Sequence, residues 1–203
     1  MTEPSHPALA SLVLGRFFVR AIVGFLLITA LWTQVSAWIS YPVAAITHIV
    51  LGNSATEWIR KIHKQPGQIE LETRITVAVP ESSRQRGTAE LVVDADPAHY
   101  AYGLPLFLAL LLASHSRHLI GRAIAGYLIL LLPQAASLSF ELLRQIMIAG
   151  GSPENLGIAQ WQMEGIALGY QVGALLLPTL APVAVWLWLD REFFAAVSEQ
   201  IHL

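Results

Sequence analysis

Cysteine is absent from the 203-residue chain, and charged residues are scarce. The first absence excludes disulfide bonds, thiolate metal sites and a cysteine nucleophile, and it leaves the redox compartment unreadable from cysteine usage. Charged residues make up 13% of the sequence, whereas soluble domains typically contain about 25%. The formal net charge of -2 excludes a nucleic-acid surface as the main function, because such surfaces carry a clustered basic excess.

Apolar residues dominate instead, at 55% of the sequence with a mean hydropathy of +0.56, which indicates an integral membrane protein. One unbroken uncharged run, residues 165–189, is long enough to cross the roughly 30 Å hydrocarbon core of a bilayer. Gly165, Gly169 and Gly173 recur every fourth residue there, so they line one stripe of the helix and predict a helix-packing face. Pro178 and Pro182 should kink the second half of this helix.

The pattern of apolar runs predicts four transmembrane helices, at residues 21–40, 98–114, 123–146 and 165–189. The segments outside them are 1–20, 41–97, 115–122, 147–164 and 190–203. A cleaved signal peptide is an alternative for the first span, because Val35-Ser36-Ala37 resembles a signal-peptidase site. The long N-terminal lead and the continuing apolar sequence favour an uncleaved anchor.

Basic residues near the predicted span ends set the expected orientation. Arg16, Arg20, Arg117, Arg122 and Arg191 fall on one side, and only Arg144 falls on the other. The positive-inside rule therefore predicts a multi-pass membrane protein with both termini in the cytoplasm. Residues 41–97 then face outward, into the periplasm if the cell is Gram-negative.

Residues 41–97 are predicted to form a small extramembrane module. An apolar stretch at 42–51 favours a helix along the membrane surface, and Ser54 with Glu57 forms a capping box for a second short helix that Pro66 and Gly67 would end. Alternating residues at 68–79 and 88–94 predict a β-hairpin. The expected fold is mainly α: a four-helix transmembrane bundle with a small α+β (helix plus β-hairpin) extracytoplasmic module between the first and second spans.

Polar side chains form one stripe of the third predicted span. The stripe comprises Gln134, Ser137, Glu141, Arg144 and Gln145. Glu141 and Arg144 are three residues apart and are expected to pair, because a charge inside the bilayer is costly. The stripe is interpreted either as a polar contact for a substrate peptide or partner helix, or as an internal salt bridge that fixes this helix against the fourth.

Other candidate residues have plainer explanations. Trp161 and Glu164 stand at the outer mouth of the fourth helix, where an acid favours the positive end of the helix dipole. His115 and His118 are three residues apart, but Arg117 lies between them and they are interpreted as polar loop residues. We expect no catalytic residue, metal site or cofactor from these patterns.

Three stretches of the chain resemble a known family. They are YGLPLFLALLLAS from Tyr102, LLPQAASLSFELLRQ from Leu131, and WQMEGIALGYQVGALLLPTLAPVAVWLWLDREF from Trp161. They are similar to the exosortase H-associated membrane proteins of Gram-negative bacteria, and the last stretch is the most specific. The resemblance carries no catalytic motif onto this chain.

The resemblance implies a partner, exosortase H: a membrane-embedded cysteine transpeptidase that processes proteins bearing a C-terminal sorting tail. Exosortases work with a Cys, an Arg and a His, so a chain without Cys is not the transpeptidase itself. The leading hypothesis is a non-enzymatic accessory subunit that associates with the transpeptidase or its tailed substrates. A small intramembrane enzyme or transporter using the Glu141 and Arg144 stripe is one alternative, and an assembly chaperone for pilus-like surface proteins is another.

Overall fold

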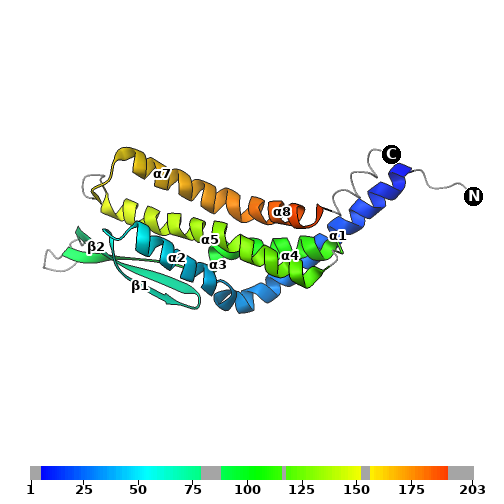
Figure 1. The fold of residues 1–203 in the computed structure, drawn as a ribbon, viewed down its shortest axis with the longest axis horizontal. Helices are drawn as coiled ribbons and strands as arrows, with labels where there is room; N and C mark the ends of the chain where they lie inside the picture. Colours follow the sequence, from blue (N-terminus) through cyan, green and yellow to red (C-terminus); the bar gives the residue numbers. More distant parts are fainter. Residues whose placement is uncertain (1–5, 79–87, 116–117, 152–155, 192–203) are drawn as a thin grey trace, which may run out of the picture. The chain divides into compact units, whose positions relative to one another are not determined.

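The computed structural model describes residues 6–78, 88–115, 118–151 and 156–191, and Figure 1 shows their arrangement in helices and strands. The helices are α1 (His6–Ile39), α2 (Tyr41–Ser54), α3 (Ala98–Ala101), α4 (Gly103–Ala113), α5 (Leu119–Gly150), α7 (Gln160–Gln171) and α8 (Leu177–Leu189), with a π-helical turn η1 (Val172–Leu176) between the last two. The strands are β1 (Ile59–Gln65), β2 (Gln68–Ala78) and β3 (Thr88–Ala95).

Among the described residues, three helical stretches are long and apolar enough to cross a membrane. They are Gly15–Ile39, Leu119–Gly150 and Gln160–Leu189. The second predicted span, 98–114, forms the shorter apolar stretch Ala98–Ala113, which at 1.5 Å per residue covers about 24 Å. The four-span bundle therefore stays a prediction, whereas the mainly helical membrane character is confirmed.

Proline explains the interruptions in two of these stretches. Pro105 has no N–H to donate to the carbonyl of Ala101, and the helix is interrupted at Tyr102, between α3 and α4. Pro178 follows the π-helical turn η1, in which the Leu177 N–H donates to the Val172 carbonyl five residues back. The wider turn therefore lets the helix continue through Pro178, which has no N–H to donate.

The predicted outer module, residues 41–97, contains a sheet of three antiparallel strands in the order β1-β2-β3. The predicted pair of strands is confirmed as β2 and β3, whose register includes Leu71 opposite Val93. The predicted helix after Ser54 is wrong, because residues 59–65 form β1 instead. Pro66 and Gly67, interpreted as a helix stop, form the turn of a β1–β2 hairpin in which Gly67 has a φ of 83°, as a type II turn requires.

The predicted capping box at Ser54 and Glu57 is also wrong, because Ser54 is the last residue of α2. Its hydroxyl donates to the Val50 carbonyl at 2.8 Å, and Asn53 donates to the Ile49 carbonyl at 2.7 Å. These side chains therefore satisfy carbonyls near the end of one helix rather than amides at the start of the next.

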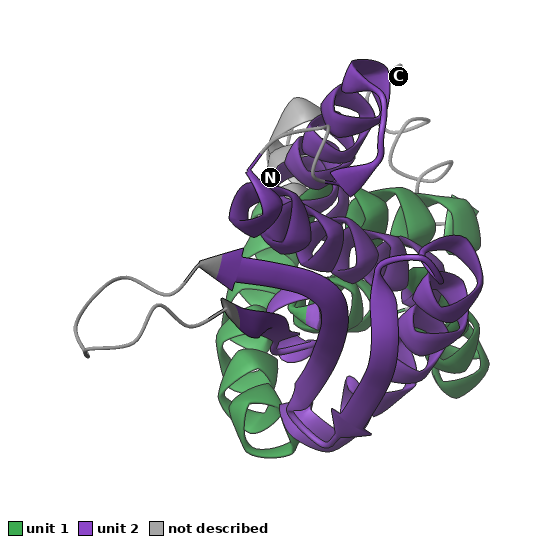
Figure 2. Ribbon diagram, turned by 90° about the vertical axis from the view of Figure 1, so that its left-hand side faces the viewer, with its two compact units in different colours: residues 1–35, 102–130, 179–203 green, residues 36–101, 131–178 purple. Residues whose placement is uncertain are grey.

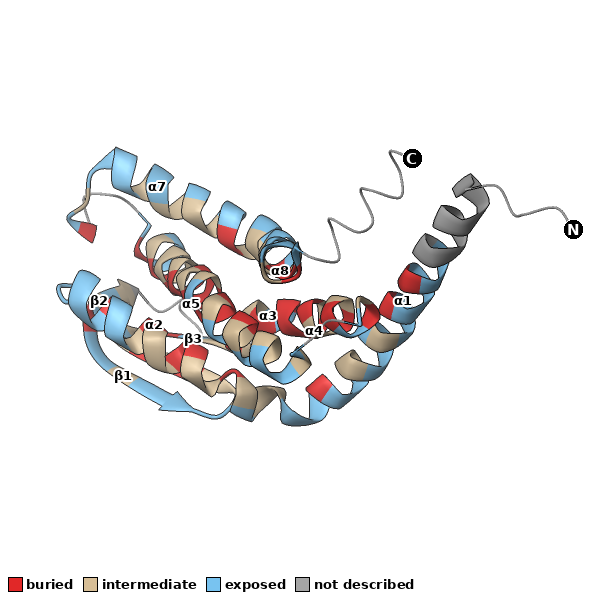
Figure 3. Cartoon of the chain, turned by 45° about the vertical axis from the view of Figure 1, so that its right-hand side comes forward, coloured by how far each residue is buried: buried red, intermediate tan, exposed pale blue. Residues whose placement is uncertain are grey.

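The chain divides into two compact units, which are coloured separately in Figure 2. Unit 1 comprises residues 1–35, 102–130 and 179–203, and unit 2 comprises residues 36–101 and 131–178. Helix α4 is the most buried helix of unit 1 (Figure 3). Phe107 within it is fully buried. The Phe107 ring occupies the space beside Gly126 of α5, where an added Cβ would approach it to 2.0 Å.

Unit 2 builds its core from the inner face of the sheet and from α2. Ile69, Leu71 and Thr73 on β2 are fully buried, and β1 lies mostly exposed at the sheet edge (Figure 3). Buried Thr47 of α2 donates to the Ala135 carbonyl of α5 at 3.2 Å. The module is thus tied to the second half of α5, which carries the predicted polar stripe.

Candidate functional site

Glu141 is the centre of a polar cluster in unit 2. Its side chain is 9% exposed and accepts from Arg144 Nε at 3.0 Å and Nη2 at 2.8 Å. Gln145 Nε2 donates to the same carboxylate at 2.9 Å, and the Tyr100 hydroxyl is hydrogen-bonded to it as well. We call Glu141, Arg144, Gln145, Tyr100 and Tyr170 the Glu141 cluster.

The same side chains connect α5 to two neighbouring segments of unit 2. Gln145 Nε2 also donates to the backbone carbonyl of Asp94 on β3 at 3.1 Å. The Arg144 guanidinium lies 4.2 Å from the centre of the Tyr170 ring on α7, within cation–π distance. One carboxylate therefore orients the side chains that hold α5 to the sheet and to α7.

The structure brings the predicted stripe together only in part. Glu141, Arg144 and Gln145 contact one another, as their spacing of three and four residues on a helix predicts. Gln134 and Ser137 are buried, and the Ser137 hydroxyl donates to the Pro133 carbonyl of its own helix at 2.7 Å. The stripe as a binding site stays a prediction.

The glycine stripe meets α5 at two of its three positions. A Cβ at Gly169 would come within 2.4 Å of the Phe140 ring, and a Cβ at Gly173 would lie 3.0 Å from the Ser137 Cα. Gly165 has no such neighbour within 4 Å. The partner helix of this packing face within the chain is therefore α5, and Gly165 does not take part.

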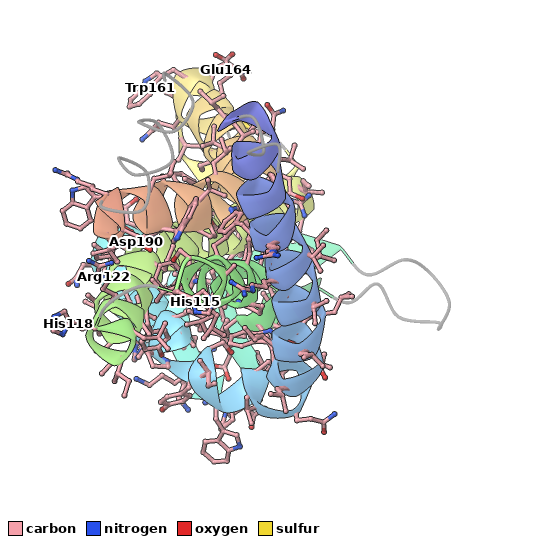
Figure 4. The ribbon with its side chains drawn as sticks, turned by 90° about the vertical axis from the view of Figure 1, so that its right-hand side faces the viewer. His115, His118, Arg122, Trp161, Glu164 and Asp190 are labelled. Atoms are coloured by element: carbon pink, nitrogen blue, oxygen red, sulfur yellow. The ribbon has the colours of Figure 1, made fainter. Side chains whose placement is uncertain are left out.

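The predicted outer mouth lies at the first turns of α7 and is labelled in Figure 4. Trp161 is 72% exposed, and Glu164 accepts from Gln160 Nε2 of its own helix at 3.3 Å. The side-chain oxygen of Gln162 accepts a hydrogen bond from the Ala159 N–H at 2.8 Å, and this bond caps the start of α7. Trp161 is thus presented outward by a firmly capped helix end.

A second polar cluster, in unit 1, is absent from the sequence-based predictions. Asp190, immediately after α8, is 2% exposed, although an Asp followed by an Arg after an apolar run is the pattern of a helix end in water. Its carboxylate accepts from the Ser114 hydroxyl after α4 and from the Arg122 guanidinium of α5, and Figure 4 shows Asp190 and Arg122 close together. We call these three residues the Asp190 cluster; the two donors compensate the burial of its charge.

The connection between α4 and α5 carries the two predicted loop histidines. His115 and His118 have φ angles of 49° and 57°, a left-handed conformation that is uncommon for residues other than glycine. Nε2 of His115 lies 2.6 Å from Nη1 of Arg20 on α1. Arg117 lies outside the described residues.

Both clusters therefore use their carboxylates to hold backbone elements together. In the described ranges, no group of three or more His, Asp or Glu side chains is arranged to hold a metal ion. Sequence reasoning missed the Asp190 cluster because its members come from three separate apolar runs. The available signal was that Ser114, Arg122 and Asp190 each adjoin the end of such a run.

Comparison with known proteins gives one match. The model of the family described as exosortase H-associated membrane protein matches residues 11–193. Curated proteins and solved structures give no match.

Proposed function

Because the chain belongs to the exosortase H-associated membrane protein family, we propose that it is a non-enzymatic accessory subunit of an exosortase H-type protein-sorting system. In this proposal it lies in the bacterial inner membrane with both termini in the cytoplasm. It assists the transpeptidase, or the recognition of substrates that bear a C-terminal sorting tail. The match over residues 11–193 is the observation that carries the proposal.

The distribution of apolar surface supports a role in association. Only 6% of the most apolar window of Gly15–Ile39 is buried within the chain, against 44% for Leu119–Gly150. Side chains such as Leu27 and Leu31 of α1 are exposed and need an apolar surrounding. Lipid supplies this surrounding, and so does a partner helix in the proposed complex.

The polar groups support a structural rather than a catalytic role. Cysteine, the nucleophile of the transpeptidase, is absent. Glu141 and Asp190 are each occupied by donors from the same chain. An acid–base role would require one of these carboxylates to exchange an internal donor for a substrate group.

The three-stranded sheet supports a role for the outer module in peptide recognition. Because the strand order is β1-β2-β3, the sheet has two edges, β1 and β3. An extended sorting motif would add to such an edge through main-chain hydrogen bonds. Deletion of residues 68–94 is expected to abolish sorting, and unchanged sorting would remove peptide capture from the proposal.

The direct test is deletion of the gene from its native host. The length of tailed substrate proteins is then followed by immunoblotting of membrane and surface fractions. The proposal expects uncleaved precursor to accumulate in the membrane, and it expects the wild-type chain to restore processing. Normal processing in the deletion strain would contradict an accessory role.

A further inference from the structure

A pocket of about 600 Å³ in unit 2 is not used by either polar cluster. Three segments line it: the link from α2 to β1, the outer part of α5, and the beginning of α7. Its volume is within the range typical of small-molecule sites. The segments are fixed by a hydrogen bond in which Trp58 Nε1 donates to the Leu156 carbonyl at 2.9 Å.

The pocket lies at the end of a candidate membrane span. Gly165 in its lining is five residues, or about 7.5 Å along the helix axis, from the start of Gln160–Leu189. Trp161, also in the lining, is 72% exposed, and tryptophan is enriched at the headgroup level of a bilayer. The pocket is therefore at the depth where lipid headgroups meet acyl chains.

The lining is divided between apolar and polar groups. Phe140, Leu143 and Ile166 supply apolar surface from α5 and α7, and Gly165 leaves space because no atom approaches its missing Cβ within 4 Å. Among the described residues that line the pocket, Glu57 alone is ionisable. An occupant that satisfies both parts is an amphiphile with a cationic group.

The indole rings and the carboxylate of the pocket favour an ammonium group as this cation. The indole rings of Trp58 and Trp161 line the same pocket as Glu57, and indole faces attract ammonium groups. In the described part of the chain, Glu57 is exposed and forms no ion pair, so its carboxylate is available to a ligand. Gln162 uses its oxygen on the Ala159 N–H, which leaves its amide nitrogen as a donor for a phosphate oxygen.

We propose that this pocket binds the headgroup and the upper acyl chain of a phospholipid with a primary ammonium, of the phosphatidylethanolamine class. The ammonium pairs with Glu57 beside the two indoles, and the acyl chain lies against Phe140, Leu143 and Ile166 over Gly165. The site is independent of the sorting role proposed above, since it needs only a bilayer.

Competitive lipid binding tests this assignment. The purified full chain in detergent is mixed with equal amounts of phosphatidylethanolamine and phosphatidylglycerol of identical acyl chains, and bound lipid is counted by native mass spectrometry. We expect a preference of about three- to fivefold for phosphatidylethanolamine, the size of an exposed charge contact. Equal binding of the two lipids, or a preference for phosphatidylglycerol, would overturn the proposal.

Charge variants locate the preference. Glu57→Gln should abolish it and Glu57→Lys should reverse it, because the first variant replaces the carboxylate by a neutral amide and the second replaces it by a cation. Glu164→Gln is the matched control: it removes an exposed carboxylate from the neighbouring helix face outside the pocket and should leave the preference intact. A preference that survives Glu57→Lys would place the lipid elsewhere.

A second pair of variants tests the apolar part of the pocket. Gly165→Leu fills the space beside Phe140 and should reduce binding of both lipids by about threefold or more. Gly121→Leu is its control, because Gly121 also has no neighbour within 4 Å of an added Cβ and lies outside the pocket. Equal lipid binding by the two leucine variants would contradict an acyl chain over Gly165.

Discussion

The two polar clusters each bury one carboxylate, yet they are assembled over very different distances in the sequence. Glu141 takes its shortest contacts from Arg144 and Gln145, three and four residues along the same helix. Asp190 takes its contacts from Ser114 and Arg122, which are 76 and 68 residues away. The first cluster can begin to form as soon as α5 is helical, whereas the second forms only when separate helices have met.

Of the substitutions considered below, we expect Asp190→Ala to destabilise the protein most. It removes the carboxylate that compensates the Arg122 guanidinium, and breaking a buried pair costs about 3 to 5 kcal/mol. Thermal or denaturant unfolding of the detergent-purified protein measures the loss. Arg191→Ala, at an exposed neighbouring residue, is the control and should change stability by less than about 0.5 kcal/mol. Equal stability of the two variants would show that Asp190 is not an anchor of unit 1.

Glu141→Ala should cost less, about 2 to 3 kcal/mol, because Arg144 is 28% exposed and can be partly hydrated after the carboxylate is lost. The protein level in membranes should fall accordingly. Arg144→Met in the Glu141→Ala background should recover part of the loss, since the unpaired guanidinium is then gone. A variant with normal protein level but lost sorting would instead support a chemical role for Glu141.

Two glycines of the stripe, Gly173 and Gly165, should differ in how much a leucine destabilises the protein. Gly173→Leu should destabilise by about 1 to 3 kcal/mol, because its Cβ would press on the Ser137 backbone, which cannot move aside as a side chain can. A Cβ added at Gly165 meets no atom within 4 Å, and the open pocket beside it has room for the rest of a leucine, so Gly165→Leu should remain within about 0.5 kcal/mol of the wild type. The difference in unfolding midpoint between the two variants measures the packing of α7 and η1 on α5. No difference would argue against that packing.

An exposed ion pair on the sheet should contribute less to stability than either buried carboxylate. Arg60 Nη1 lies 2.7 and 2.8 Å from the two carboxylate oxygens of Glu90, but both side chains are more than half exposed. Arg60→Ala should therefore cost at most about 1 kcal/mol, and salt should screen even that contribution. A loss of stability as large as that caused by Asp190→Ala would show that burial does not determine how much each ion pair contributes.

Local patterns in the sequence predicted the features that depend on nearby residues. The uncharged run at 165–189 lies within a candidate span, the alternation at 68–79 and 88–94 corresponds to β2 and β3, and Glu141 pairs with Arg144. β1 was missed because its four basic residues suit a wet helix face as well as an edge strand. Only its pairing with β2 decides between these structures.

The features that depend on distant residues were not readable in this way. Asp190 next to Arg191 has the pattern of a helix end in water, and its burial follows from donors on α5 and after α4. The glycine stripe was visible, but its partner helix was not, since any helix with a suitable surface satisfies the pattern. Which stripe residues would touch a substrate is likewise not encoded in spacing alone.

We propose that this chain works as a subunit beside an exosortase. This proposal is tested most directly by purifying the C-terminally tagged protein from gently solubilised native membranes and identifying the co-purifying proteins by mass spectrometry. We expect recovery of an exosortase or its tailed substrates, at levels well above those recovered with an unrelated tagged membrane protein. Recovery of this chain alone would contradict the accessory role and would turn attention to the Glu141 cluster as a site of chemistry.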